Sequence, residues 1–199
     1  LIDLIKQPPS GHGRVRGIDL RGEKAGWLTL YSGIAGGADI ILIPEMPYDI
    51  NNIVAAIERR NASGKSFSIV AVAEGCYDVE ESRMKRREWR AIRDERGYGN
   101  ATARIAEDVT RLTGFETRVA EPGHIQRGGT PSAYDRILAT EFGTYAAQLV
   151  ENEQFGVTVA MMNNKIVSNP LSDVAGRTKL VTEDCDLIAV ARRMGVSMG

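Results

Sequence analysis

Short apolar runs alternate with stretches of helical spacing along most of the chain. The apolar runs predict strands at residues 14–20, 38–43, 67–73 and 117–120, and the helical spacing predicts helices at residues 26–36, 49–62, 100–112, 130–150 and 183–194. Two of the runs, 38–43 and 67–73, are apolar at nearly every position, which is typical of strands covered on both faces. The alternation predicts an α/β protein with three α/β/α layers and a mainly parallel sheet.

Several local signals set the ends of these elements. LIDLIK at the start has the pattern of a helix tail that Pro8-Pro9 ends. Asp49 is a capping residue for the helix to residue 62. The stripe of Ile105, Val109 and Leu112 predicts the buried face of helix 100–112. Residues 157–162 and 165–167 form a predicted hairpin across Asn163-Asn164, a pair that tolerates positive φ.

Residues 78–96 carry many arginines and lysines interleaved with acids. A purely basic run would suit a polyanion, but the mixed signs favour a solvated helix or a surface insertion. The whole chain of 199 residues has a net charge of -1, so its charge indicates neither nucleic acid nor an anionic membrane as a partner.

No apolar run is long enough to cross a bilayer, and the start of the chain lacks the layout of a signal peptide. The hydrophobic content of 43% is that of a soluble globular protein. Cys76 and Cys185 lie far apart without CxxC spacing, which favours free thiols in a reducing compartment. Cytoplasm is therefore the default expectation.

The stretch PGHIQRGGTPSAYDR, residues 122–136, concentrates candidate chemistry. It places His124 and Arg127 directly after a predicted strand. Thr130 is expected as the cap, and Pro131 as the first residue, of the next helix. In open α/β sheets ligands bind at the carboxyl ends of strands. A histidine and an arginine there suit an anionic, hydroxylated ligand such as a sugar phosphate, although a glycine-rich connector with a solvated arginine fits the residues equally well.

Other common site motifs are absent from the sequence. There is no P-loop and no complete G-x-G-x-x-G, which disfavours a dinucleotide-binding domain. No group of residues has metal-ligand spacing, so no metal-binding residue is predicted.

Several segments together resemble the phosphofructokinase family. They are AGWLTLYSGIAGGADIILIPE, IVAVAEG, TRVAEPGHIQRGGTPSAYDRILATEFG and VARRMGVSMG, in the family's order. The resemblance implies phosphoryl transfer in glycolysis, from ATP or pyrophosphate with Mg²⁺, to the 1-hydroxyl of fructose 6-phosphate. It also implies a homo-oligomer, either a dimer or a tetramer. Residues 1–125 would form the fructose 6-phosphate-binding domain, and residues 126–199 would cross back toward a donor domain and end in a closing helix.

The resemblance assigns substrate-binding roles to five residues. They are Arg14, Glu74, Arg118, His124 and Arg127. Arginine donors match phosphate oxygens, histidine can bond phosphate or hydroxyl, and a carboxylate accepts from sugar hydroxyls. The family counterparts of Arg14 and Arg118 reach a site in the neighbouring subunit. An ordinary surface ion pair is the alternative for each residue. A weaker likeness to the family's effector site involves Lys6, Asp39 and Lys65.

Two departures from the family pattern bear on catalysis. The motif MGR-x-x-G is replaced by RGE-x-A-G, which puts Glu23 where a basic residue stands near the transferring phosphate. An acid there would repel a phosphoryl group. The GGDG-type donor loop and the TIDND-type catalytic segment are missing and would lie upstream of Leu1. We therefore expect a C-terminal part of a 6-phosphofructokinase that is inactive alone, and identify no catalytic residue.

The alternative is a non-catalytic sugar-phosphate-binding or regulatory subunit of the same family. The long stretch between Glu74 and Arg118 and the AEG strand ending resemble longer family members, some of which use pyrophosphate. The choice of donor therefore stays open.

Overall fold

The computed structural model describes residues 2–6 and 14–199, so the predicted helix end at Pro8-Pro9 lies outside the described residues. The chain divides into two compact units. The first unit comprises Leu1–Gln126 and Lys179–Gly199, and the second comprises Arg127–Thr178. The functional division at residues 125 and 126 stays a prediction.

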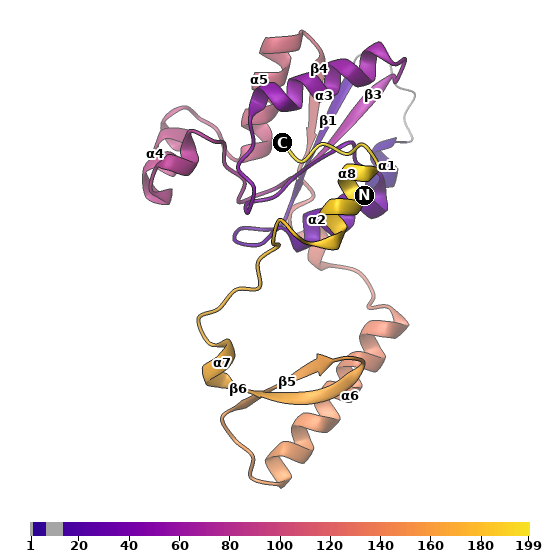
Figure 1. Cartoon of the computed structure of the whole chain (residues 1–199), viewed down its shortest axis with the longest axis vertical. Coiled ribbons are helices and arrows are strands. Elements are labelled where there is room, and N and C mark those ends of the chain that lie inside the picture. Colours follow the sequence, from indigo (N-terminus) through magenta and orange to yellow (C-terminus); the bar gives the residue numbers. More distant parts are fainter. Residues whose placement is uncertain (1, 7–13) are drawn as a thin grey trace. The chain divides into compact units, whose positions relative to one another are not determined.

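A parallel sheet forms the centre of the first unit (Figure 1). Its strands, in the spatial order β2-β3-β1-β4, are β2 (Ile40–Leu42), β3 (Phe67–Ala73), β1 (Arg14–Leu20) and β4 (Glu116–Ala120). Each neighbouring pair is parallel, with Arg14 opposite Phe67 in β3 and opposite Glu116 in β4. The four predicted strands and their parallel pairing are thus confirmed.

Helices cover both faces of this sheet, so the three-layer fold is also confirmed. The described helices of the first unit are α1 (Ile2–Lys6), α2 (Trp27–Gly36), α3 (Ile50–Ala62), α4 (Arg86–Glu95), α5 (Ala101–Thr113) and α8 (Asp186–Arg193). On one face α3 and α5 bury Ile53 and Val109 against Val70. On the other, α2 and α8 bury Leu30 and Ile188.

Local sequence explains where the helices start and stop. The Asp49 carboxylate accepts from the Asn51 amide, and the Asn100 side chain accepts from the Ala103 amide. Gly37 ends α2 in the left-handed conformation that glycine adopts without a Cβ clash. One prediction was wrong here: Leu112 is 43% exposed, because α5 turns the stripe of Ala101, Ile105 and Val109 toward the sheet and leaves Leu112 to one side.

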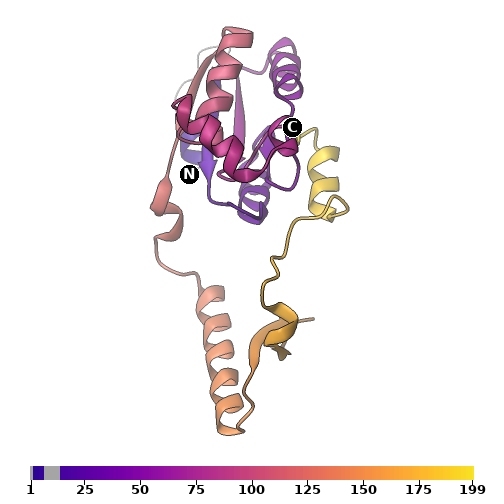
Figure 2. The ribbon, with the colours of Figure 1, turned by 90° about the vertical axis from the view of Figure 1, so that its left-hand side faces the viewer.

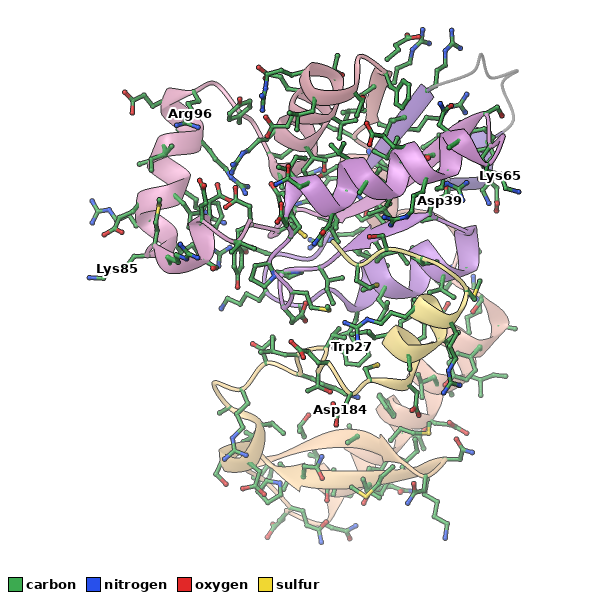
Figure 3. All side chains as sticks on the ribbon, turned by 45° about the horizontal axis from the view of Figure 1, so that its top comes forward. Trp27, Asp39, Lys65, Lys85, Arg96 and Asp184 are labelled. Atoms are coloured by element: carbon green, nitrogen blue, oxygen red, sulfur yellow. The ribbon has the colours of Figure 1, made fainter. Side chains whose placement is uncertain are left out.

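The charged stretch, residues 78–96, contains a 3₁₀-helix, Glu81–Arg83, followed by α4. Most of its side chains are exposed, as expected for a surface insertion, and Lys85 and Arg96 mark the two ends of α4 in Figure 3. Trp89 and Arg93 are nevertheless buried. Contrary to the sequence prediction, the helix is therefore not solvated on all sides, because Trp89 and Arg93 attach it to the rest of the unit.

The second unit contains one long helix, a hairpin and a short helix. α6 (Ala133–Glu151) lies alongside β5 (Val157–Met162), which pairs with β6 (Lys165–Pro170), and α7 (Leu171–Val174) follows (Figure 2). The predicted turn is confirmed, since Asn163 and Asn164 have φ of 51° and 60°.

The cap of α6 differs from the prediction. Ser132, not Thr130, is the N-cap: its hydroxyl accepts from the Asp135 amide, and the Asp135 carboxylate accepts from the Ser132 amide. This reciprocal pair satisfies two donors that would otherwise lack partners. A hydrogen bond from the Ser132 hydroxyl, followed by the one from the Ser132 amide, lowers the pKa of Asp135. Pro131 therefore precedes the helix instead of opening it.

Candidate functional site

A cleft of about 660 Å³ lies at the edge of the sheet where its strands end. Because parallel strands point the same way, β1, β3 and β4 deliver their next residues to this edge. Those residues are Arg21, Glu74 and Glu121, and all three line the cleft. Asp19 from the end of β1 and Gly123 complete this wall.

Glu74 is held in place by the turn that follows β1. Its Oε2 lies 2.9 Å from Nη1 of Arg21, and its Oε1 accepts from the Gly22 amide at 3.3 Å. The turn also packs directly on Gly75, where an added Cβ would come within 2.1 Å of the Glu23 carbonyl oxygen. Only glycine permits that approach. Glu74 is thus a fixed hydrogen-bond acceptor at the strand edge.

Asp19 is a second, partly buried carboxylate of this wall. Burial raises its pKa, the nearby Glu121 and Glu74 raise it further, and a hydrogen bond from the Thr102 hydroxyl acts in the opposite direction. That hydrogen bond measures 2.9 Å. Carboxyl groups with shifted pKa values in a cleft are candidates for binding or proton transfer.

Residues of α4 also line the cleft. Arg90 and Arg86 donate to the same Oε1 of Glu23, at 2.8 and 2.7 Å. The hydrogen bond from Arg90, followed by the charge of Arg86, lowers the pKa of Glu23. The sequence predicted that Glu23 would repel a phosphoryl group; in the structure its charge is matched by these two arginines.

Buried charges fix α4 to the rest of the unit. Arg93 donates from Nε and Nη2 to the two oxygens of Glu81, at 2.8 and 2.6 Å, and from Nη2 to the Cys76 carbonyl at 2.9 Å. Arg104 of α5 pairs with Glu81 at 2.6 Å and also with Asp78. Buried ion pairs persist where such additional hydrogen bonds complete them.

The residues of the GHIQR motif form a 3₁₀-helix, Gly123–Arg127, next to the cleft. Gln126 hydrogen-bonds the backbone at both Asp19 and Arg21. His124 is exposed and directly follows Gly123 of the cleft lining. Arg127 is the first residue of the second unit.

Arg14, at the start of β1, and Arg118, in the middle of β4, share one carboxylate. Both bind Glu116: the Arg14 Nε is 3.1 Å, and the Arg118 Nη2 is 2.6 Å, from its carboxylate oxygens. Arg14 opens β1, whereas Asp19 and Arg21 of the cleft stand at its far end. Six residues of strand span roughly 20 Å. Within one chain the structure therefore brings Arg14 and Arg118 to each other but not to Glu74.

Asp39, from the weaker likeness to the effector site, is partly buried. It accepts from the Ile69 amide at 2.8 Å and pairs with Arg60 at 2.8 Å. Burial raises its pKa, while the charges of Arg60, Lys6 and Lys65 act against this shift. Asp39 and Lys65 are labelled in Figure 3. The close partner, Arg60, was not predicted.

Sequence reasoning also missed Asp19, Arg21 and Arg90 as cleft residues. The position of the first two at the end of a predicted strand was a usable signal. Arg90 offered none, because its place depends on how α4 folds back. Among the described residues, no group of three or more His, Cys, Asp or Glu side chains is arranged to hold a metal ion.

The fold places this chain among the parallel α/β proteins. Its charged cleft lies at the carboxyl edge of the sheet, which is where such proteins bind small molecules. A family model described as Phosphofructokinase matches residues 1–150, and the chain belongs to that family.

Similar proteins and solved structures also belong to this family by their names. The chain is 46% identical over 198 residues to an ATP-dependent 6-phosphofructokinase of Spirochaeta thermophila, covering 100% of this chain and 54% of that protein. It is 44% identical, with the same coverage, to ATP-dependent 6-phosphofructokinase 3 of Bacteroides thetaiotaomicron. The chain thus spans about half the length of the curated relatives it matches.

The Pichia pastoris phosphofructokinase in the T-state superposes with a TM-score of 0.68 at 31% identity, over 86% of this chain and 18% of that one. A pyrophosphate-dependent phosphofructokinase from Marinobacter aquaeolei shares the fold, with a TM-score of 0.70 at 19% identity over 94% of this chain and 45% of that one. Within the described residues, no helix is long and apolar enough to span a membrane.

Proposed function

We propose that this chain is the C-terminal part of a 6-phosphofructokinase and binds fructose 6-phosphate in the cleft at Glu74. The bound sugar would receive a phosphoryl group on its 1-hydroxyl, in cytoplasmic glycolysis. The observation that carries the proposal is that two carboxylates, Glu74 and Asp19, line one cleft together with Arg21 and Arg90 in a chain of this family.

The residues have distinct roles in this proposal. Glu74 accepts hydrogen bonds from sugar hydroxyls, because an ionised carboxylate offers only acceptors. His124 and Arg127 bind the 6-phosphate from the loop beside the cleft. Arg21 and Arg90 supply positive charge within the cleft itself.

Arg14 and Arg118 act on a neighbouring copy in this proposal. The two arginines are paired on one carboxylate and lie too far from their own Glu74 to share a ligand with it. A homo-oligomer, a dimer or a tetramer, would bring them to the phosphate of another subunit. Lys6, Asp39 and Lys65 remain candidates for an effector site.

The phosphoryl donor and Mg²⁺ would be held mainly by residues outside this chain. The relatives are named for ATP and one structural neighbour for pyrophosphate, so either donor fits. Bound metal would neutralise charge on the donor phosphates.

Calorimetric titration with fructose 6-phosphate tests the proposal. Glu74→Gln keeps the shape of the side chain but removes a charged acceptor, and should weaken binding roughly ten- to a hundredfold. Glu58→Gln, the same change at an exposed position on α3, is the matched control and should bind like the unaltered chain. Absence of binding to the unaltered chain, or equal affinity in Glu74→Gln, would refute the proposal.

A coupled assay addresses turnover. The 199-residue chain with Mg²⁺ and either ATP or pyrophosphate should not phosphorylate fructose 6-phosphate, because its sequence contains neither a GGDG-type donor loop nor a TIDND-type catalytic segment. Sustained turnover that Glu74→Gln abolishes would show that the reaction centre lies within these residues.

Glu23 favours a second candidate, a non-catalytic sugar-phosphate-binding or regulatory subunit. An acid tied to two arginines at this position suits binding better than stabilisation of a transferring phosphoryl group. A longer form of the protein that contains the missing motifs and turns over fructose 6-phosphate would exclude it.

A further inference from the structure

The side chain of Gln126 continues the sheet beyond the end of β4. Its Oε1 accepts from the Arg21 amide at 2.9 Å, and its Nε2 donates to the Asp19 carbonyl at 3.2 Å. The pairing of β1 with β4 stops at Ile18 and Ala120. The amide and carbonyl bound by Gln126 are therefore the next backbone groups along that edge of β1.

The geometry is that of a residue in a parallel ladder. Such a residue donates to the carbonyl before, and accepts from the amide after, the residue it faces. Gln126 does both around Leu20, with one side-chain amide in place of a backbone unit. The partners also fix the orientation of the amide group, since a carbonyl only accepts and a backbone amide only donates.

Gln126 contacts the backbone of two residues that line the cleft. Gln126 is the last residue of the first unit, and it joins β1 to a turn 105 positions away in the sequence. His124 and Arg127 flank it in the same 3₁₀-helix. Asp19 and Arg21, whose backbone it holds, line the cleft. One amide group thus links the cleft wall to the loop of predicted phosphate ligands.

We propose that Gln126 is a positioning residue that sets the turn at residues 123–126 in register with the end of β1, and thereby places His124 for an anionic, hydroxylated ligand. The effect on the ligand rests on the proposed function. The hydrogen bonds themselves do not, so the two parts can be tested separately.

Hydrogen exchange of the Arg21 amide tests the contact without any ligand. Gln126→Met preserves length but offers neither donor nor acceptor, so exchange of this amide should become roughly five- to tenfold faster. Gln154→Met, at an exposed position in the second unit, should leave it unchanged. Equal Arg21 exchange in Gln126→Met and the unaltered chain would overturn the proposal.

Gln126→Glu tests positioning through its pH dependence. The carboxylate cannot donate to the Asp19 carbonyl, so fructose 6-phosphate should bind about tenfold more weakly near pH 7.5. A protonated carboxyl has one donor and one acceptor, like the amide. The charged groups at the strand ends are Asp19, Arg21, Glu74 and Glu121, and the excess of carboxylates favours protonation.

The ratio of affinities between Gln126→Glu and the unaltered chain should therefore return toward one near pH 4.5, around the ordinary pKa of glutamic acid. Gln154→Glu carries the same added charge and should match the unaltered chain at both pH values. Unchanged affinity near pH 7.5, or a loss that is the same at both pH values, would overturn the positioning role. If the unaltered chain does not bind, the proposed function fails, while the exchange experiment still decides the contact.

Discussion

At the scale of single residues, Asp19 is a carboxyl group of the cleft whose surroundings disfavour its charged form. It is partly buried, it faces Glu121 and Glu74, and one hydrogen bond from Thr102 offsets only part of this. Because its pKa is raised in the folded state, the folded protein favours the protonated form more than the unfolded chain does.

Asp19→Asn should therefore stabilise the protein at neutral pH. The contribution of a raised pKa is fully present below the pKa of the unfolded chain and is lost as the pH rises through the folded pKa. The asparagine oxygen can still accept from Thr102. The free energy of unfolding should exceed that of the unaltered chain near pH 7, and the difference should shrink toward zero below about pH 4.

Urea unfolding across this range measures the difference. A stability difference for Asp19→Asn that is independent of pH would contradict the raised pKa.

Some single residues could be predicted from the sequence, and others could not. Glu74 was predictable, because it directly follows a strand whose apolar run is unmistakable, and such ends meet at one edge. Ser132 was not: Thr130 and Ser132 both suit a cap, and only the reciprocal bond with Asp135 decides between them. The Glu23 charge was visible in the sequence, but its neutralisation by Arg86 and Arg90 depends on tertiary structure.

At the scale of elements, α4 is an exposed helix with a buried attachment. Arg93 stacks on Trp89, with its guanidinium carbon 4.4 Å from the ring centroid, and binds Glu81 bidentately. The side chains of Arg93 and Glu81 are 6% and 8% exposed. This attachment, and not the exposed pairs with Glu23, sets the place of the helix, because exposed ion pairs contribute little.

Arg93→Met should test the attachment. It keeps the aliphatic volume but leaves Glu81 with Arg104 alone, so unfolding free energy should fall by about 3 kcal/mol. Arg87→Met, on the exposed face of the same helix, should change it by less than about 0.5 kcal/mol. Denaturant unfolding gives both values. Equal stability of the two variants would show that the buried pair does not hold α4.

The strands and helices themselves were largely predictable, since long periodic stretches record their burial in the sequence. β1 was the weakest case, as RVRGIDL has few apolar residues for a strand at an inner position of the sheet. Its polar residues are accommodated by neighbours that no local pattern reveals: Arg16 lies over the Phe67 ring, and Thr102 packs over Gly17.

At the scale of the whole molecule, the proposed function expects a second copy of the chain to complete the site. Arg14 and Arg118 form a basic pair around Glu116 on the edge strand β4. Arg14 stands at the end of β1 far from the cleft, so in the proposed function its contribution to binding depends on assembly.

Arg118→Ala should weaken fructose 6-phosphate binding roughly ten- to a hundredfold in an assembled oligomer, because one charged hydrogen bond to phosphate is lost. Arg59→Ala, on the exposed side of α3, should bind like the unaltered chain. Calorimetric titration of both variants, after sedimentation has established the assembly state, tests whether Arg118 contributes to binding. Equal affinities in a confirmed oligomer would remove Arg118 from the site.

The central claim is that fructose 6-phosphate occupies the cleft at the carboxyl edge of the sheet, and amide chemical shifts measured during a titration test it most directly. The shifts should concentrate at residues 19–22, 74–75 and 121–126, and Glu74→Gln should strongly reduce them at the same ligand concentration. Shifts confined instead to residues around Asp39 and Lys65, or unchanged by Glu74→Gln, would contradict it.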